Sequence, residues 1–234
     1  MLSVQVMSTS PRWLNMIGAN AGKLFNPSIQ TGSRKLKSVT NLFLSGFESN
    51  NLTTEGFSAL DNIPTIVTSP VKTGNYALEA TPLQSVSHKF SSSGVGIIYA
   101  YTDLYVQSLP DLQCHIIVIV DALDTNEQLI NIDLDATGKL VLLDGIGNPH
   151  GSSPVLSLST WYKVNFTVNG TDASAITINA SLNGIQFGSA TYDNTVNGVG
   201  NNQLTDLWIG LDIVGGDVTL GKIDFDNIFI NNLS

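Results

Sequence analysis

The sequence predicts an all-β protein: a two-sheet antiparallel jelly-roll sandwich with an extended N-terminal arm. Short runs that favour β-strands recur every 8–14 residues from residue 41 onward, with turn signals between them. No stretch of this part keeps a helical periodicity for more than two turns. Only 12% of the residues are charged, while Gly, Asn, Ser and Thr are plentiful, a composition typical of turn-rich β structure.

The strand-like runs are rich in β-branched and aromatic residues, and they end at Gly, Pro, Asn, Asp or Ser. A dozen or more antiparallel strands in about 190 residues indicate a two-sheet sandwich or jelly roll, and 234 residues are an ordinary length for one such domain. The runs cover residues 40–47, 64–69, 75–80, 87–91, 96–109, 114–123, 128–135, 139–145, 154–159, 161–170, 174–183, 185–191, 205–212 and 222–231.

Two turn signals identify hairpins between consecutive runs. Asn183-Gly184 is a strong two-residue hairpin signal, because both residues tolerate a positive φ. Ala136-Thr137-Gly138 fits a short hairpin with a positive-φ glycine. The sequence has no internal repeat at a fixed period, so we do not expect a propeller or a solenoid.

The first 40 residues differ from the rest, and we interpret residues 1–40 as an arm and residues 41–234 as the sandwich. Residues 1–47 contain no Asp or Glu, whereas the remaining 187 residues hold all 19 acids and five lysines. A segment of about +5 is thus attached to a body of about −14. A basic arm of this kind suggests docking onto something negative. The residues expected to carry this assembly contact are Arg12, Trp13, Lys23, Arg34, Lys35 and Lys37.

Several classes of protein are disfavoured by the composition. No apolar run approaches the ~20 residues of a membrane-spanning helix, and no secretory signal is visible near the start. The dispersed basic residues form no nucleic-acid-binding motif, so we expect the arm to dock on protein. A single cysteine, Cys114, excludes an internal disulfide framework and is expected to be a small buried residue.

The order of elements resembles the concanavalin A-like lectin and glucanase jelly rolls, including laminin G-like domains. The resemblance lies in GFES at 46–49, KTGNYALEA at 72–80, LSTWYKVNFTVNG at 158–170 and the closing KIDFDNIFINN at 222–232. Domains of this kind are also found in phage virion proteins. The resemblance implies that the final strand runs beside the first and closes a sheet; it supports the fold more than a function.

No catalytic constellation is apparent, and we therefore expect the protein not to be an enzyme. Glucanases of this fold set their carboxyls on one strand as Glu-x-Asp-x-x-Glu, and the nearest run here, residues 131–135, has two aspartates and no glutamate. Gln113-Cys114-His115 is similar to one motif of jelly-roll polysaccharide lyases, but the arginine-rich and tyrosine-lysine motifs are absent. The three histidines suggest no Ser/His/Asp triad.

The strongest functional signal is an aromatic stripe in the run GIIYAYTDLYVQSL, residues 96–109. By alternation, Tyr99, Tyr101, Asp103 and Tyr105 share one face, and their neighbours on that face lie ~6.5–7 Å apart. Sugars stack on such faces, and the interleaved carboxylate could accept hydroxyl hydrogen bonds. The alternative is that the tyrosines pack against the second sheet or a neighbouring protomer. The polar loop at 145–153 could add ligand contacts through Asn148 or His150, or could simply be a turn.

The final run places Asp224 and Asp226 on either side of Phe225. We expect Ile223, Phe225 and Phe229 on one face of that strand, with the two carboxylates on the other face at its solvated end. No cofactor is otherwise expected, and calcium, which prefers carboxylate and amide oxygens, is the one candidate. Its candidate ligands are Asp224 with Asp226, Asp133 with Asp135, and Asp212 with Asp217; the alternative is that such aspartates serve solubility.

These observations favour a non-enzymatic virion structural protein, a phage capsid decoration, fibre or adhesion component. In this hypothesis the arm anchors a lectin-like domain to other virion proteins, the assembly is a homo-oligomer, and a cell-surface glycan is a possible ligand. We expect neither nucleic acid nor a membrane as partner. The alternative is a free, extracellular carbohydrate-binding module or lectin.

Overall fold

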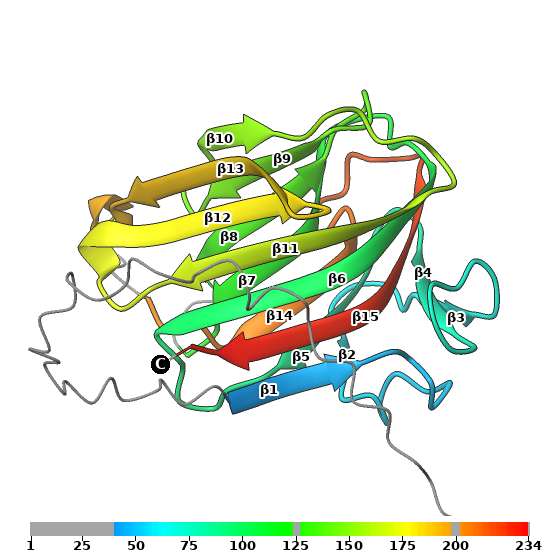
Figure 1. The fold of residues 1–234 in the computed structure, drawn as a ribbon, viewed down its shortest axis with the longest axis horizontal. Helices are drawn as coiled ribbons and strands as arrows, with labels where there is room; N and C mark the ends of the chain where they lie inside the picture. The colour runs from blue at the N-terminus through cyan, green and yellow to red at the C-terminus, as the bar shows by residue number, and fades with distance from the viewer. Residues whose placement is uncertain (1–39, 124–126, 198–201, 234) are drawn as a thin grey trace, which may run out of the picture. The chain divides into compact units, whose positions relative to one another are not determined.

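The computed structural model describes residues 40–123, 127–197 and 202–233, which form two antiparallel sheets packed face to face (Figure 1). The predicted all-β sandwich is confirmed. The first sheet has eight strands in the order β13-β12-β11-β6-β15-β4-β3, with β1 also paired to β15. Their bounds are β1 Thr40–Ser45, β3 Thr65–Val67, β4 Ala77–Ala80, β6 Ile97–Ser108, β11 Trp161–Asn169, β12 Ile176–Leu182, β13 Ile185–Tyr192 and β15 Lys222–Asn232.

The second sheet has seven strands in the order β10-β9-β8-β7-β14-β5-β2. Their bounds are β2 Ser58–Ala59, β5 Gln84–Lys89, β7 Cys114–Asp121, β8 Glu127–Leu134, β9 Leu140–Asp144, β10 Pro149–Ser152 and β14 Asp206–Leu211. Within the described ranges the helical segments are two 3₁₀ turns, Ala173–Ala175 and Asn194–Asn197. Among these residues no helix has the length and apolar character that crossing a bilayer requires.

The core lies between the two sheets and is built by the inward half of each alternating strand. Burying one such side chain stabilises the fold by roughly 1.5–3 kcal/mol, so these side chains together are a major source of its stability. The largest fully buried side chains are Phe47, Phe225, Leu78, Ile98, Leu104, Ile116, Ile117, Ile119, Leu129, Ile130, Ile132 and Leu134.

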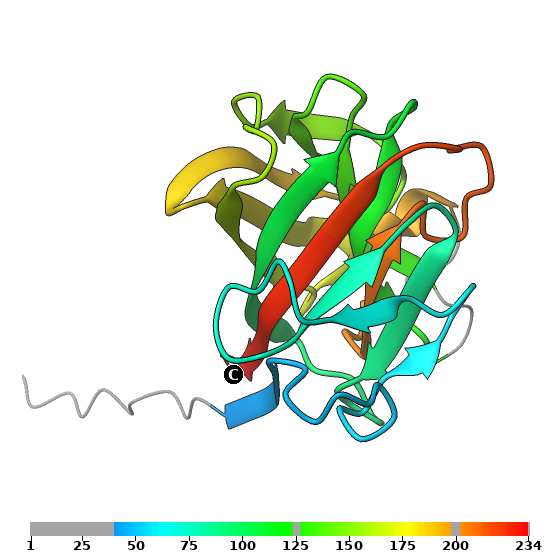
Figure 2. The ribbon, with the colours of Figure 1, turned by 90° about the vertical axis from the view of Figure 1, so that its right-hand side faces the viewer.

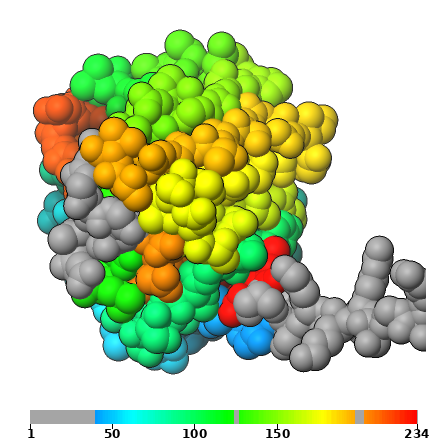
Figure 3. Space-filling model, turned by 90° about the vertical axis from the view of Figure 1, so that its left-hand side faces the viewer, coloured from blue at the N-terminus to red at the C-terminus, as the bar shows by residue number. Residues whose placement is uncertain are grey.

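The closing strand β15 lies at the centre of the first sheet. It pairs with β6 along nearly its whole length, with β4 at its start and with β1 at its end. Figure 2 shows β15, in red, beside green β6, and Figure 3 shows its end at the surface next to blue β1. The expectation that the last strand runs beside the first is thus met.

A β-bulge interrupts β15 between Asp226 and Phe229. Asn227, within the bulge, has a φ of 49°, in the left-handed region that Asn tolerates better than most residues. The extra residue shifts the alternation, so that Ile228 and Ile230 face the core after the bulge.

The predicted partition of this strand between its two faces was wrong at Phe229. Ile223 and Phe225 are buried in the core as expected. Phe229, however, lies on the outer face, where its ring stacks on that of Tyr101. A strict period of two cannot represent the bulge, and this is the physical reason for the error.

The turn predictions agree with the structure, and one strand prediction does not. Asn183 and Gly184 both have positive φ, 50° and 82°, between β12 and β13. Gly138 has a φ of 85° between β8 and β9. Residues 154–159, predicted as a strand, form no strand; the short β10 lies instead in the preceding segment, which was interpreted as a loop.

The predicted arm of residues 1–40, apart from Thr40 in β1, lies outside the described residues. This applies to every candidate in it: Arg12, Trp13, Lys23, Arg34, Lys35 and Lys37. The boundary near residue 40 and the role of the arm remain predictions.

Candidate glycan-binding face

The outer face of the eight-stranded sheet carries the tyrosine stripe of β6. Ile98, Ala100 and Leu104 are buried in the core, whereas Tyr99, Tyr101 and Tyr105 are half-buried on the opposite side, as the alternation predicted. β6 lies between β11 and β15, so its outward side chains have neighbours on both sides. The site is therefore a sheet face assembled from several strands.

The tyrosines are part of a larger aromatic row. Tyr101 stacks on Phe229 of β15, with ring centroids 5.1 Å apart and an interplanar angle of 25°. Tyr105 packs against Trp161 of β11 at 5.1 Å. Sequence reasoning missed Phe229 and Trp161. The alternation Trp-x-Lys-x-Asn-x-Thr in the run 161–167 could have indicated an outward-facing row on β11.

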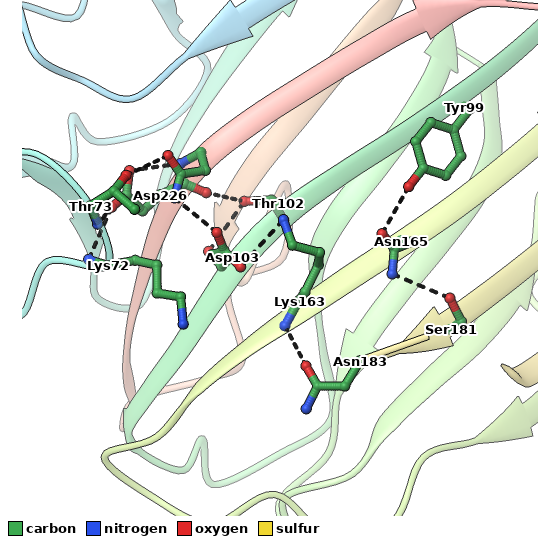
Figure 4. A network of polar contacts seen from close by, with 11 residues as sticks. Lys72, Thr73, Tyr99, Thr102, Asp103, Lys163, Asn165, Ser181, Asn183 and Asp226 are labelled. Atoms are coloured by element: carbon green, nitrogen blue, oxygen red, sulfur yellow. Dashed lines mark hydrogen bonds and ion pairs between the residues drawn. The ribbon is translucent and has the colours of Figure 1, made fainter. Parts of the chain in front are cut away.

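Lys163 covers the ring of Tyr101, so this tyrosine is not a bare platform. Its Nζ lies 3.7 Å from the ring centroid. The same Nζ lies 3.7 Å from Oδ1 of Asp103 (Figure 4). Asp103 is 3% exposed, and its Oδ2 accepts a hydrogen bond of 2.8 Å from Nδ2 of Asn227. Burial, together with the neighbouring Asp103 and Tyr99, raises the pKa of Tyr101. The expected role of Asp103 as a free acceptor is thus restricted by two protein partners.

A pocket of about 240 Å³ opens beside Tyr99, on the strands β6, β11, β12 and β13. Tyr99 Oη donates to Asn165 Oδ1 at 3.0 Å, and Asn165 Nδ2 donates to Ser181 Oγ at 3.4 Å (Figure 4). Asn179 Nδ2 donates to Thr167 Oγ1 at 3.2 Å. Amide and hydroxyl groups next to an aromatic ring are the groups that a sugar uses for orientation and stacking. Of the pocket's polar side chains, only Tyr99 was a sequence-based candidate.

Asp224 and Asp226 also lie on this face, but the prediction that they sit at a solvated end is wrong. Both are 0% exposed. Asp226 Oδ2 accepts from the backbone N–H groups of Lys72 at 3.0 Å and Thr73 at 2.9 Å, and its Oδ1 accepts from Asn227 N at 2.7 Å (Figure 4). Burial nevertheless raises its pKa. Asp226 therefore ties the loop before β4 to β15.

Asp224 is less well satisfied than its neighbour. Its Oδ2 accepts from Gln107 Nε2 at 2.8 Å, while Oδ1 has no hydrogen-bond partner among the described residues. Gln107 Nε2 also donates to Glu79, whose other oxygen is 3.0 Å from Lys222 Nζ. Burial raises the pKa of Asp224 to about 7. In the described part of the chain, no group of three or more His, Cys, Asp or Glu side chains is arranged to hold a metal ion. Calcium binding stays a prediction.

Asn148 and His150 are not brought to the tyrosine face. They belong to the hairpin of β9 and β10, at the edge of the other sheet. His150 Nε2 lies 2.7 Å from Asp144 Oδ2, and Asn148 bonds the same carboxylate through its backbone and side chain. Although burial raises the pKa of Asp144, these hydrogen bonds leave it below its ordinary value. These contacts hold the β9–β10 hairpin together, and a ligand contact of Asn148 or His150 stays a prediction.

A second polar cluster, on the seven-stranded sheet, surrounds His115. Its Nδ1 lies 2.5 Å from Oδ1 of Asp133. The other oxygen of this carboxylate, Oδ2, accepts a hydrogen bond of 2.8 Å from Gln113 Nε2. The hydrogen bond to Asp133 raises the pKa of His115, against the effect of burial. The imidazole lines a pocket of about 310 Å³ and could serve as an oriented base. Cys114, as expected, is buried, and burial raises its pKa to about 12.

Comparison with known proteins yields structural likeness only. No family model and no curated protein matches the chain. An endo-β-1,4-glucuronan lyase from the fungus Trichoderma reesei is similar at a TM-score of 0.59 and 12% identity, over 82% of this chain and 96% of the lyase. A carbohydrate esterase from the Shiga toxin-encoding bacteriophage phi24B is similar at 0.58 and 15%, over 84% and 100%.

A third similar structure is that of botulinum neurotoxin type C, whose cell entry depends on interaction with two ganglioside molecules. The TM-score is 0.52 at 12% identity, over 75% of this chain but only 43% of the toxin chain. At such identities the likeness shows the fold alone. It confirms the jelly-roll-like β-sandwich that the sequence resemblance implied.

The comparisons also correct one prediction. The expectation that the protein is not an enzyme is wrong, because a lyase and an esterase are among the structures that share this sandwich over nearly their whole length. The absence of a familiar catalytic motif therefore does not exclude a reaction on this scaffold. The fold is shared by enzymes and by binding domains, and it assigns no reaction to this chain.

Proposed function

We propose that the protein binds a glycan on the outer face of its eight-stranded sheet. The observation that carries the proposal is the pocket beside Tyr99, which joins an aromatic ring to the amide and hydroxyl groups of Asn165, Asn179 and Ser181. The similarity to a toxin that interacts with gangliosides and to two carbohydrate-active enzymes supports this class of ligand.

The chemistry of the pocket suits a pyranose. The C–H groups of a sugar ring would pack on the half-buried face of Tyr99, and its hydroxyls would exchange hydrogen bonds with the amides of β11 and β12. The pocket is smaller than the ~300–1,000 Å³ of a drug-sized ligand site, so it would hold about one sugar unit. Further units would lie along the aromatic row toward Tyr101 and Phe229.

The site is tested by glycan-array binding of the full chain, followed by titration of the best glycan with variants. Tyr99→Ala and Asn165→Ala should each weaken binding at least about tenfold, since each removes a central contact. Tyr101→Ala should matter less, because Lys163 and Phe229 cover its ring. Thr191→Ala, an exposed polar residue of β13 outside the pocket, is the matched control. Unchanged affinity in both Tyr99→Ala and Tyr101→Ala, with the fold intact, would refute the proposal.

We also propose that this sandwich is carried on a virus particle and is held to other virion proteins by its N-terminal segment. Two observations favour it: the charge contrast between an acid-free segment with five basic residues and an acidic body, and the similarity to a phage carbohydrate esterase over that protein's whole length. The test is to remove residues 1–39. We expect the truncated protein to be lost from the particles. Absence of the full chain from particles would favour the alternative, a free extracellular carbohydrate-binding module.

A further inference from the structure

Among the residues that the structure describes, no charged side chain lines the pocket beside Tyr99. Its polar lining consists of Tyr99, Asn165, Thr167, Asn179, Ser181 and Gln186, and the remaining contacts come from Phe166, Ala180 and Gly184. We infer that the site takes an uncharged glycan unit and discriminates against uronic and sialic acids. This inference rests on the proposed glycan-binding function and specifies the ligand class of the same pocket.

The polar lining has the dual hydrogen-bonding character that sugar hydroxyls require. Each carboxamide has two N–H donors and two acceptor lone pairs, and each hydroxyl can both donate and accept. Asn165 and Asn179 each commit one N–H to a neighbouring hydroxyl at the pocket floor. The second N–H of each amide remains for a ligand hydroxyl. The internal bonds fix the orientation of these side chains before the ligand arrives, which lowers the entropic cost of binding.

A ligand carboxylate would lose its hydration in this pocket without gaining a cation. The cost of removing a charged group from water is large unless the group is paired. Gln186 and the two asparagines offer neutral donors only, so they could hydrogen-bond a carboxylate but could not neutralise its charge. A hydroxymethyl group at the same position of the sugar ring meets no such penalty.

Lys163, a described cation of this face, is already engaged. Lys163 precedes Asn165 by two positions on β11, so its side chain leaves the sheet ~6.5–7 Å away on the same face. Its ammonium lies 3.7 Å from Asp103 Oδ1 and over the ring of Tyr101. If it moved to a ligand carboxylate, the almost fully buried Asp103 would keep only the neutral Asn227 amide as a partner for its charge.

The charge of the body acts in the same direction. Residues 48–234 contain 19 acidic and five basic residues, a net charge of about −14. A field of this sign lowers the local concentration of anionic glycans and slows their approach, most strongly at low ionic strength. Neutral glycans experience neither effect. Their binding is therefore expected to depend little on salt.

The test compares matched glycan pairs that differ only in charge, on the full chain: sialylated and desialylated forms, and hexose oligosaccharides with their uronate counterparts. The neutral member of each bound pair should bind at least about tenfold more tightly than the anionic member. Gln186→Lys places a cation in the pocket lining from a solvent-exposed position, so it should raise the affinity for the uronate relative to that for its neutral partner at least about tenfold; this ratio cancels the loss of the Gln186 amide, which both glycans share.

The outcomes separate the inference from the function on which it rests. A uronate or a sialylated glycan that binds as tightly as its neutral partner overturns the inference and leaves glycan binding in place. Loss of that anionic binding in Lys163→Gln would identify Lys163 as the anion contact instead. If no member of any pair binds, the proposed function itself is wrong, and the inference falls with it.

Discussion

At the scale of single residues, the least expected feature is the burial of Asp224. Sequence reasoning placed this carboxyl at a solvated strand end, but Gln107 and the flanking strands enclose it, and one of its oxygens has no partner among the described residues. Alternation shows which face a side chain occupies. It does not show whether long neighbours such as Gln107 and Lys222 cover that face, because this depends on which strands lie alongside.

The buried carboxyl makes the stability of the protein depend on pH in a defined window. The folded-state pKa of Asp224 is about 7, above its ordinary value of 3.8, because burial disfavours the charged form. The folded state therefore binds a proton between these two pH values that the unfolded state does not bind. We therefore expect the contribution of Asp224 to the free energy of unfolding to decrease as pH rises from about 4 to about 7, by up to several kcal/mol, and then to level off.

We expect Asp224→Asn to remove this dependence, because an amide stays neutral at every pH. From pH 5 to pH 8, the free energy of unfolding of the variant should increase relative to that of the parent protein. Urea unfolding of both proteins at the two pH values measures this change. All other ionisable groups are the same in both proteins, so their contributions cancel in the difference. Asp111→Asn is the matched control: hydrogen bonds from Thr219 and Leu220 hold the pKa of Asp111 at about 2, so its effect should be equal at pH 5 and pH 8. If each substitution changed the free energy of unfolding by the same amount at pH 5 as at pH 8, the proposed role of the buried Asp224 carboxyl would be contradicted.

At the scale of elements, the tyrosine strand and the final strand show what alternation can and cannot predict. β6 keeps a strict period of two, and its inward and outward residues were predicted correctly. In β15 the alternation of inward and outward side chains shifts by one residue at the bulge, and the spacing of apolar residues in the sequence indicates this shift. The core residues Ile223, Phe225, Ile228 and Ile230 are spaced by two, three and two positions. A three-residue step within an apolar strand pattern is the signal that indicates a bulge.

The bulge requires a residue that tolerates positive φ, and this gives a test with two substitutions at one site. Asn227→Gly and Asn227→Val both lose the bonds to Thr73 Oγ1 and Asp103 Oδ2, but only valine adds a β-branched side chain at a φ of 49°. We expect the valine variant to be less stable than the glycine variant by about 1–2 kcal/mol in chemical denaturation.

The same pair of substitutions at Asn41, an exposed position of β1, provides the control. There valine should be at least as stable as glycine, since β-branched residues favour strands and glycine weakens them. If valine also equalled or exceeded glycine at position 227, the left-handed conformation would not be what selects asparagine there.

At the scale of the whole molecule, the fold was predictable and the candidate site only in part. Strand-like runs, hairpin signals and the lack of helical periodicity were sufficient for a two-sheet sandwich. The pocket combines β6 with β11, β12 and β13, so its composition depends on strand order, which alternation within a single run cannot supply. Tyr99 was therefore found from the sequence, whereas Asn165 and Ser181 were not. Asn148 and His150 were assigned to the same site, although they lie at the edge of the other sheet.

The division of charge along the chain leads to a prediction about assembly. Pairing in the described sheets begins at Thr40, which lies opposite Asn232. A variant lacking residues 1–39 should therefore unfold at the same denaturant concentration as the full chain and bind the same glycans. It should fail to join virus particles when it is the only form supplied during their assembly.

A second variant separates charge from mere length. Replacing Arg12, Lys23, Arg34, Lys35 and Lys37 with glutamine keeps the segment and removes its charge. If the segment docks on an acidic protein surface, this variant should also be lost from particles, and raising the salt concentration should release the full chain from them. Normal incorporation of the truncated protein would show that the sandwich itself makes the assembly contact. A sandwich that unfolds without the segment would show that residues 1–39 contribute to the stability of the domain.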